Sequence, residues 1–464
     1  YSHQQQAEAD KNSRLNRRQF LKIGSAGAVL GAMELVNSPA KLAADAANET
    51  IQKDVVEEHH RFPVKISSDY KPFPQKNTVF SQAVGGTHKT LGPLARTFER
   101  YECDDSKPGF TRIDWALHHS TWSIEHSATP GSKFGTPNVG WYSWKQKTKK
   151  ERESFLDLNY VYDEKYQFKS KKEASDSIKR AARLFGVELV GITRRNKKWD
   201  YSEHYNPMTH EEISWDKFPF EPKSVIVLAV EMDYESIATA PSYTLEGAIG
   251  EGYSTMAVVA YQLSIFLKCL GYKAVAAGND LGLSVPYAIQ AGLGEGGRNG
   301  LLITYKYGPR VRLCKIYTEL DFVEYDKPIT FGAWSFCERC QRCADACPAN
   351  AISKDLKPSM APTHDNPEKW FNNPGVDKWY LNAKQCFEYW CKANNSCGTC
   401  IASCPYNKPD FWHHRMIDKF NAILPGPVHS FMREMDIVFG YGNTFDEKAV
   451  KKFWASNGRK YLGF

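Results

Sequence analysis

Eight of the twelve cysteines fall into two sets in the last third of the chain, and their spacing is typical of metal clusters. The first set reads C-x2-C-x2-C-x3-C-P and consists of Cys337, Cys340, Cys343 and Cys347. The second set ends in the same C-x2-C-x3-C-P, but ten residues separate its first two cysteines; it consists of Cys386, Cys397, Cys400 and Cys404. Thiolates at this spacing hold two 4Fe–4S clusters in bacterial proteins.

In two-cluster proteins of the bacterial ferredoxin type, the last cysteine of each run ligates the other cluster. The loop before it presents three thiolates to one cluster, whereas the cysteine before the proline begins a helix that points away. We therefore assign one cluster to Cys337, Cys340, Cys343 and Cys404. The other cluster takes Cys386, Cys397, Cys400 and Cys347. This exchange would bring the two clusters close together, which suits electron transfer between them.

Other uses of these cysteines fit the pattern less well. Disulfides are common in exported proteins, but doubled cluster spacing does not favour them, and a zinc site would not need the paired Cys-Pro endings. Cys391 lies between predicted ligands and could replace Cys386. The cysteines outside the motifs are expected to be buried thiols; they are Cys103, Cys269 and Cys314.

Residues 1–46 resemble a twin-arginine (Tat) export signal. Arg17 and Arg18 precede a mildly apolar stretch, Ile23–Val36, which Glu34 interrupts, and small residues follow. A basic surface helix is the alternative. Since the Tat machinery carries folded proteins, a cofactor could be inserted before export. No other stretch has the roughly 18 apolar residues of a membrane span, so we expect a soluble protein or one that a partner holds at the membrane.

The rest of the chain divides into four segments by composition. Residues 47–165 are interrupted by Pro and Gly and rich in aromatic residues, and we expect irregular structure that covers the active site. In 166–330, apolar runs of strand and helix length alternate, which predicts an α/β sandwich. Residues 331–410 hold the cysteine motifs, and 411–464 form an aromatic extension.

Apolar spacing within 166–330 predicts the individual elements. The expected helices are Lys171–Phe185, Tyr253–Leu270 and Val285–Ala291. The expected strands are Val187–Thr193, Ser224–Glu231, Lys273–Ala277, Gly300–Thr304 and Leu313–Leu320. The glycine-rich stretch 292–297 does not occur in a dinucleotide-binding context, so by itself it indicates only a close approach of the backbone.

Charge and composition narrow the class of function. The net charge of +7 is spread along the chain without a long run of Lys or Arg, so there is no signal for nucleic-acid binding. The 12 Trp, 24 Tyr and 25 Phe suggest aromatic packing and an apolar ligand pocket. Two clusters carry electrons but do not choose a reaction, so a catalytic centre must lie elsewhere in the chain.

Four segments resemble the corrinoid-dependent reductive dehalogenases of organohalide respiration. They are Pro-Lys-Ser-Val-Ile-Val at 222–227, Gly-Asn-Asp at 278–280, the glycine-rich run at 291–304, and Phe-Gly-Tyr-Gly at 439–442. The resemblance covers nearly the whole chain and is closest from 165 to 442. It implies a nitroreductase-like α/β (α+β) domain that binds a corrinoid (cobamide) in its base-off form, with electrons arriving through the two 4Fe–4S clusters.

The same resemblance implies a reaction and partners. The enzyme, an oxidoreductase, would remove halide from a small organohalide, with chlorinated ethenes as the first candidates and chlorinated methanes or ethanes as close alternatives. It would act as the terminal reductase of an anaerobic respiration, with electrons from a quinone-linked donor. It would lie on the outer face of the cytoplasmic membrane, attached peripherally through a small integral-membrane anchor subunit.

The resemblance also assigns roles to single residues. Tyr253, in Tyr-Ser-x-Met, is the expected proton donor, Arg312 would stabilise its anion, and Asn279 would orient the substrate or the leaving halide. Trp390, four residues after Cys386, is expected in the substrate pocket. The expected corrinoid contacts are Ser254, Met256, Gly278, Gly292, Gly294, Phe439 and Tyr441. The pocket aromatics of the N-terminal region cannot be assigned, because that region diverges too far.

Elementary chemistry supports these roles. Reduced cobalt is a strong nucleophile and reductant, and breaking a carbon–halogen bond leaves a carbanion or radical that needs a proton. A phenol, with a pKa of about 10, gives up its proton readily at neutral pH only when its anion is stabilised, as by a cation within about 4–6 Å. The motif Asp-x-His-x-x-Gly, which supplies a lower cobalt ligand in other corrinoid enzymes, does not occur. Its absence fits base-off binding, or no corrinoid at all.

Two other functions fit part of the sequence. An epoxyqueuosine-reductase-like enzyme would share the corrinoid domain and the cluster segment, but the export signal and the missing basic patch count against it. An exported iron–sulfur electron-transfer subunit without a corrinoid is the second alternative. The long aromatic and glycine-rich region ahead of the clusters exceeds what a docking module needs, and cobalt content would separate the two functions.

Overall fold

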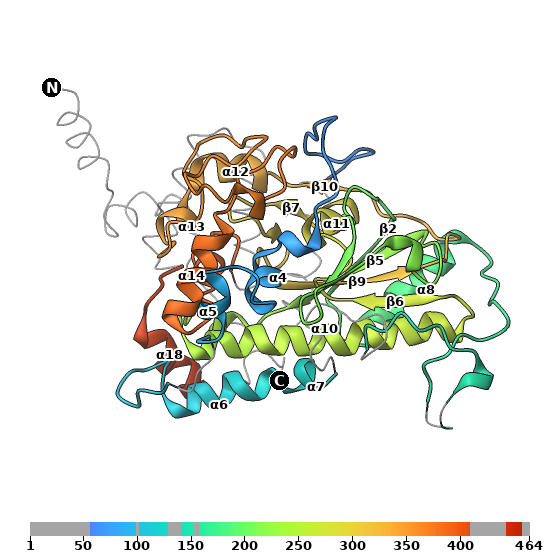
Figure 1. The fold of residues 1–464 in the computed structure, drawn as a ribbon, viewed down its shortest axis with the longest axis horizontal. Helices are drawn as coiled ribbons and strands as arrows, with labels where there is room; N and C mark the ends of the chain where they lie inside the picture. The colour runs from blue at the N-terminus through green and yellow to red at the C-terminus, as the bar shows by residue number, and fades with distance from the viewer. Residues whose placement is uncertain are drawn as a thin grey trace, which may run out of the picture.

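The computed structural model describes residues 56–98, 102–128, 141–152, 154, 157–408 and 442–456. The predicted signal at 1–46 lies outside the described residues, as do Phe439, Tyr441 and most of the predicted C-terminal extension. In Figure 1, a long helix runs beneath a central sheet, and the cysteine-rich segment lies at one end of that sheet.

A four-stranded antiparallel sheet forms the centre of the middle segment. Its order is β2 (Leu189–Arg194), β5 (Ser224–Glu231), β9 (Val311–Thr318) and β6 (Ala274–Ala277). Strand β5 reads Ser-Val-Ile-Val-Leu-Ala-Val-Glu, and every residue except Glu231 is buried. An apolar strand that is buried on both faces needs a covering layer on each side.

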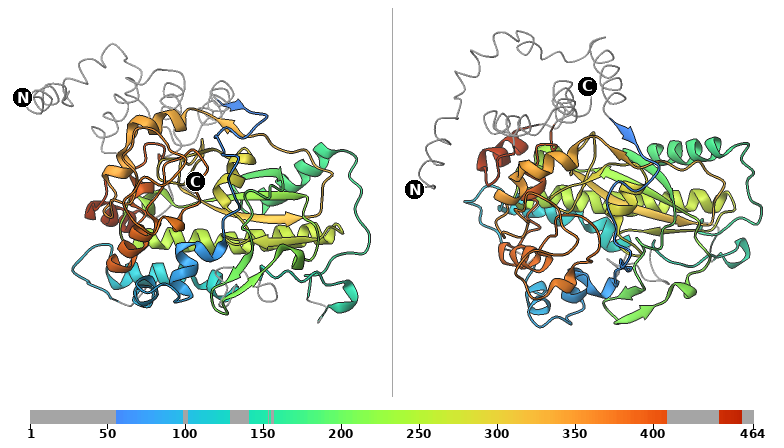
Figure 2. Two further views of the ribbon diagram at one scale, coloured as in Figure 1. Left: turned by 45° about the horizontal axis from the view of Figure 1, so that its top comes forward. Right: turned by 90° about the horizontal axis from the view of Figure 1, so that it is seen from above.

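Helices supply both layers. One face packs against α8 and α10, which join Ile226 in an apolar core. The other face packs against α11, which joins Val225 in a second core. The bounds are Lys171–Leu184 for α8, Tyr243–Cys269 for α10 and Ser284–Gln290 for α11. The predicted α/β sandwich is therefore confirmed, and the two views of Figure 2 show its layers from other sides.

Short elements surround this sandwich. Ahead of it in the chain lie β1 (Glu57–Glu58), η1 (Gln75–Asn77), α4 (Val79–Val84), α5 (Leu91–Ala95), α6 (Arg112–Thr121), α7 (Ser123–Ala128) and η2 (Lys149–Glu151). Inserted in it are β3 (His204–Asn206), β4 (Glu211–Ile213), η3 (Trp215–Lys217), α9 (Tyr234–Ile237), β7 (Glu295–Gly296) and β8 (Leu302–Ile303). After it come β10 (Ile329–Thr330), α12 (Ala333–Cys340), α13 (Arg342–Asp345), η4 (Lys369–Phe371), α14 (Ala383–Ala393), α15 (Thr399–Ala402) and α18 (Glu447–Ala455). Among the described helices, none is both long and apolar enough to cross a membrane.

The predicted elements of the middle segment are present; several bounds are shifted by one or two residues, and two elements differ clearly in length. Strand β8 covers only two residues of the expected Gly300–Thr304. Helix α10 begins at Tyr243, ten residues before the expected start, where the Ser242 side chain accepts a hydrogen bond from Leu245 N. The first three turns contain glycines, which weaken a helix in isolation, so the sequence pattern did not indicate the true start.

These glycines allow close packing along α10. A Cβ at Gly247 would lie 2.9 Å from the Leu117 side chain of α6, and one at Gly250 would lie 2.7 Å from the Trp122 ring. A Cβ at Gly252 would lie 2.8 Å from Arg312 Cγ. The tertiary contacts therefore outweigh the poor helix propensity of this stretch.

Gly191→Ala should destabilise the sandwich, because an added Cβ would lie 2.2 Å from the Ala291 backbone oxygen and would force β2 away from the end of α11. We expect a loss of about 3 kcal/mol in the free energy of unfolding, measured by urea denaturation. Gly186→Ala is the control: its Cβ would meet no atom within 4 Å, so only the strain of a φ of +100° remains and the loss should be smaller. Wild-type stability in Gly191→Ala would contradict this packing.

Candidate functional site

A cavity of about 610 Å³ lies where the sandwich, the N-terminal helices and the cysteine-rich segment meet. This volume is in the range of small-molecule sites. Most of its lining is apolar or aromatic. Side chains from all three regions contribute, among them Phe80, Phe98, Trp122, Tyr253, Asn279, Arg312, Phe387 and Trp390.

The structure brings together the residues predicted for catalysis. Tyr253, Asn279, Arg312 and Trp390 all line the cavity. Asn279 Nδ2 donates a hydrogen bond of 2.9 Å to the Tyr253 hydroxyl oxygen. The Arg312 guanidinium carbon lies 5.0 Å from the centroid of the Tyr253 ring. Because the amide donates this bond, the phenolic hydrogen is not used in it.

Three elements hold this group. Tyr253 projects from α10, Arg312 from β9 opposite Val230 of β5, and Asn279 from the loop after β6. On its other face, the Tyr253 ring stacks on Trp122 with a centroid distance of 5.0 Å and an interplanar angle of 23°. The phenol is thus fixed by an aromatic ring, a guanidinium and an amide from separate parts of the chain.

A buried lysine secures the loop that carries Asn279. Lys315 Nζ donates hydrogen bonds of 2.7 Å to Gly278 O and to Ser284 Oγ, on either side of that residue. Burial raises the pKa of Asp280 to about 6, although the positive charge of Lys315 opposes the rise. Burial lowers the pKa of Lys315 to about 8. The charge of each group opposes the effect of burial on the pKa of the other, and the two hydrogen bonds of Lys315 hold the loop against β9.

Of the residues predicted to contact a corrinoid, the five that the structure describes are not among those that line the cavity. Ser254 Oγ donates to Thr121 O at 2.5 Å, and Met256 belongs to the core between α10 and the sheet. At the three predicted glycines, other parts of the protein take the space that a side chain would need. A Cβ at Gly278 would lie 3.2 Å from the Tyr142 ring. A Cβ at Gly292 would lie 2.4 Å from Lys327 O, and one at Gly294 would lie 2.1 Å from Ile303 O. Their predicted role toward the cofactor stays a prediction. The glycines that do line the cavity follow in the same run; they are Gly296, Gly297 and Gly300.

The N-terminal region supplies pocket residues that sequence reasoning could not assign. Phe80 contacts the rings of Phe387 and Trp390 at centroid distances of 5.3 Å and 5.7 Å. Glu125 lines the cavity although it is only 4% exposed, and its carboxylate lies 3.5 Å from His126 Nε2. The abundance of aromatic residues indicated a pocket but not which of them form it.

The first predicted cluster site is intact. Cys337, Cys340, Cys343 and Cys404 line one small cavity. Burial raises the pKa of the Cys343 thiol well above its usual value, and Cys337, Cys340 and Cys404 raise it further, so these thiols lie within electrostatic reach of one another. This grouping agrees with the predicted exchange of the last cysteine, because Cys404 sits with the first set.

The second set has the corresponding arrangement. Burial raises the pKa of the Cys386 thiol, and Cys400, Cys397 and Cys347 raise it further. Burial also raises the pKa of Cys400 to about 12, with contributions from Cys397 and Cys347. Cys347 thus lies with the second set, as predicted.

Two alternatives from the sequence concerned the cysteines: Cys391 as a cluster ligand, and disulfide bonds. Cys391 is buried in a separate apolar cluster with Phe371 and Phe387, which does not favour it as a ligand in place of Cys386. None of the twelve cysteines forms a disulfide. The expectation of buried thiols is correct for Cys314 but wrong for Cys269, which is exposed at the end of α10, and for Cys103, which is half-buried in a loop.

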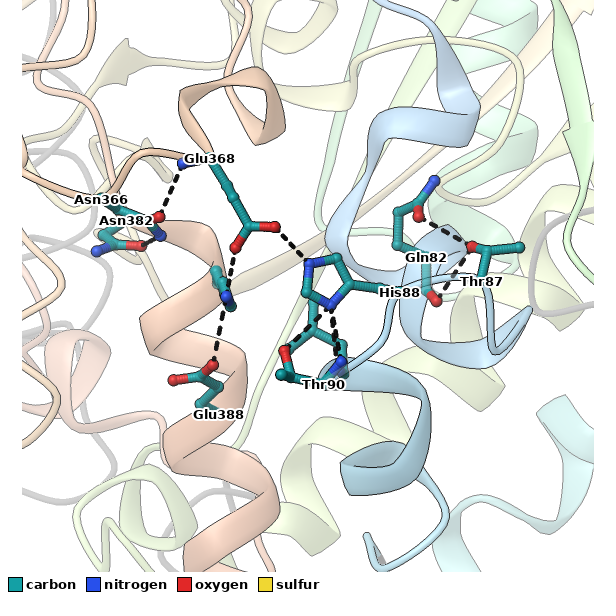
Figure 3. A network of polar contacts seen from close by, with 10 residues as sticks. Gln82, Thr87, His88, Thr90, Asn366, Glu368, Asn382 and Glu388 are labelled. Atoms are coloured by element: carbon teal, nitrogen blue, oxygen red, sulfur yellow. Dashed lines mark hydrogen bonds and ion pairs between the residues drawn. The ribbon is translucent and has the colours of Figure 1, made fainter.

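A polar network joins the N-terminal side of the cavity to the cluster segment (Figure 3). His88 Nδ1 accepts a hydrogen bond from Leu91 N, so its Nε2 carries the hydrogen and donates to Glu368 Oε1 at 2.6 Å. The other Glu368 oxygen accepts from Lys384 of α14. Through Glu368, α4 and α5 are therefore held against the helix that carries Trp390.

The comparisons with known proteins first define the class. Residues 336–407 match a family model described as "4Fe-4S double cluster binding domain". This range contains all eight predicted ligands, so the segment binds two 4Fe–4S clusters.

Relatives then define the family. The chain is 31% identical to tetrachloroethene reductive dehalogenase of Desulfitobacterium hafniense, over 95% of this chain and 98% of that relative. It is 30% identical, with the same coverage, to tetrachloroethene reductive dehalogenase of Dehalobacter restrictus (strain DSM 9455 / PER-K23). The chain therefore belongs to the reductive dehalogenase family, oxidoreductases that act on carbon–halogen bonds.

Solved structures share the fold at lower identity. The catabolic reductive dehalogenase NpRdhA has a TM-score of 0.66 and 19% identity, over 88% of this chain and 53% of that one. A reductive dehalogenase described in terms of B12-dependent dehalogenation has a TM-score of 0.62 and 17% identity, over 89% of this chain and 53% of that one. The chain spans about half the length of these structures, and the likeness confirms the predicted fold class.

His88→Ala should loosen α4 and α5 from α14, because it leaves Glu368 with one partner fewer and deprives Leu91 N of its acceptor. We expect a loss of about 1–3 kcal/mol in local stability, seen as faster amide hydrogen exchange in 78–98. Lys76→Ala is the control, since its ion pair with Glu212 is more than 40% exposed on both sides and contributes at most about 1 kcal/mol. Equal exchange in the two variants would contradict a holding role for His88.

Proposed function

We propose that this protein removes halide from a small organohalide at a base-off corrinoid in the cavity, with electrons from the two 4Fe–4S clusters. The observation that carries the proposal is the group of Tyr253, Asn279 and Arg312 on the cavity lining, beside the second cluster site. Tyr253 and Cys400 both pack against the apolar cluster that contains Ile249, which makes the path from the cluster site to the cavity short.

Tyr253 supplies the proton in this proposal. Its hydroxyl accepts from Asn279 and keeps its own hydrogen for a substrate atom in the cavity. Once the proton has left, the Asn279 amide and the Arg312 guanidinium stabilise the phenolate. Trp122 and the other aromatic side chains exclude water from this transfer, so the charges act in a medium of low polarity.

Features of the cavity fit a bound corrinoid. Arg312 Nε is buried and has no hydrogen-bond partner among the described residues, so a bound group can satisfy it. A Cβ at Gly300 would meet no atom within 4 Å, which leaves room beside the backbone of the glycine run. Arg312 and the 296–300 loop are the residues that would hold the group. When bound, a corrinoid supplies reduced cobalt as nucleophile and electron donor toward the carbon–halogen bond.

The substrate class follows from the lining and the relatives. An apolar, aromatic cavity suits a small organohalide without charge. The relatives at 30% and 31% identity are named for tetrachloroethene, which favours chlorinated ethenes for this chain as well.

The physiological setting is part of the same proposal. The arginine pair at 17–18 with its apolar stretch supports export by the Tat machinery. The enzyme then works on the outer face of the cytoplasmic membrane, held by a small integral-membrane anchor subunit, as the terminal reductase of organohalide respiration with quinone-linked electrons.

Tyr253→Phe should retain eight irons and one corrinoid per chain but lose most dehalogenation, because the ring keeps its stacking on Trp122 and loses the hydroxyl, which is both the acid and the acceptor of the Asn279 bond. A general acid contributes about 10²–10⁴-fold, so turnover should fall by that factor. The control is Tyr261→Phe, on the same helix, where the ring stacks on Trp141 at 5.1 Å and does not line the cavity. Full activity in Tyr253→Phe would rule out its role as proton donor.

Chloride release from a panel of organohalides, with a reduced viologen as donor, tests the substrate. We expect chlorinated ethenes to react fastest, ahead of chlorinated methanes and ethanes, and halogenated phenols to react slowly because the cavity is mostly apolar. Iron and cobalt are measured on the same preparation. Eight irons without cobalt, and no chloride release, would instead indicate an electron-transfer subunit.

A further inference from the structure

Arg298 is a buried cation beside the first cluster site. It lies in the loop between β7 and β8 and is only 1% exposed. The cavity that Cys337, Cys340, Cys343 and Cys404 line is also lined by Arg298. Its guanidinium carbon lies 4.7 Å from the centroid of the Trp379 ring.

The guanidinium hydrogens bond to backbone carbonyls of the cluster segment. Nε and Nη2 donate to Cys337 O at 3.0 Å and 2.8 Å. Nη1 donates to Ser353 O at 2.8 Å and to Asp355 O at 2.7 Å. These bonds neutralise no charge, and across the described residues no carboxylate lies within ion-pair distance of Arg298.

Another buried arginine, Arg310, has a carboxylate partner. Arg310 is also 1% exposed, but its Nη1 pairs with the Glu231 carboxylate, and Nε donates to Asn407 Oδ1 at 2.9 Å. Arg310 thus has its own counter-charge, as expected for a charge inside a protein. Arg298 has no such carboxylate partner among the described residues, and it lines the same cavity as the four cysteines of the first cluster site.

We propose that Arg298 is the counter-charge of the cluster held by Cys337, Cys340, Cys343 and Cys404, and that it raises the reduction potential of this cluster. A 4Fe–4S cluster with four thiolates is anionic, and reduction adds one more negative charge. A fixed cation in a buried site stabilises the reduced form more than the oxidised form, and local charge is one of the factors that set cluster potentials. The inference rests on the two clusters and does not depend on the substrate.

At the second cluster site, a cationic side chain that acts on Cys400 is Arg312, which is half-buried and lies over the Tyr253 ring. The two cluster sites therefore differ in the cation beside them: the one at the first site is buried and the one at the second is half-buried.

The test is a redox titration of the purified holoprotein, monitored by the EPR signals of the reduced clusters. Arg298→Gln removes the charge and keeps an amide donor, so we expect one of the two potentials to shift to a more negative value while the other stays. Arg298→Lys keeps the charge and should leave both potentials close to those of the wild type. Arg339→Gln is the matched control, because Arg339 lies between Cys337 and Cys340 in sequence but is exposed, so water and salt screen its charge.

An unchanged pair of potentials in Arg298→Gln, or a shift no larger than that in Arg339→Gln, would overturn the proposal. A shift in Arg298→Lys as large as that in Arg298→Gln would also overturn it, because the hydrogen bonds and not the charge would then set the potential. If Arg298→Gln does not retain eight irons, Arg298→Met, which also removes the charge, takes its place; lowered potentials in a fully loaded Arg298→Lys would still refute the charge role.

Discussion

The contact between Gly252 of α10 and Arg312 of β9 is the constraint on which the proposed site depends. Arg312 Cγ occupies the space that a side chain at position 252 would need, so the guanidinium passes directly beside the next residue, Tyr253. A larger residue at 252 would displace Arg312 from the Tyr253 ring and would separate the helix from the strand. A phenol and a cation that lie far apart along the chain are thereby held 5.0 Å apart.

The cavity closes only when three regions of the chain meet. The sandwich supplies the reactive group, α4 supplies Phe80, the residues after α5 supply Phe98, and α14 supplies Phe387 and Trp390. The described part of the N-terminal region consists of short helices and loops, and ring contacts and the His88–Glu368 pair hold α4 and α5 in place. This explains why a region with irregular sequence can still form an ordered side of a reactive site: its order comes from the elements that it covers.

The pattern of apolar residues predicted the sandwich because the sheet is buried on both faces. A strand buried on both faces is a continuous apolar run, so the sequence predicted Ser224–Glu231 with the correct bounds. Cysteine spacing predicted both ligand sets, since the spacing itself reflects the shape of a cluster. The start of α10 could not be predicted, because Gly247, Gly250 and Gly252 are unfavourable until α6 and Arg312 pack against them. The aromatic residues of the pocket could not be predicted either, because Phe80 and Phe387 are far apart in the sequence and meet only in the folded protein.

The loop from Gly296 to Gly300 links all the parts of this arrangement. Its glycines line the cavity, Arg298 bonds to the carbonyl of a first-cluster ligand, and Asn299 Nδ2 lies 3.5 Å from Cys400 O of the second. One short segment thus contacts the cavity and the ligand loops of both clusters. A Cβ at Gly297 would lie 2.8 Å from the Ile303 side chain, and one at Gly296 would lie 3.3 Å from the Trp334 ring, so the backbone packs closely against both side chains. Close packing of a segment that touches the cavity and both ligand loops sets the distances over which electrons pass, and transfer between redox centres depends on those distances.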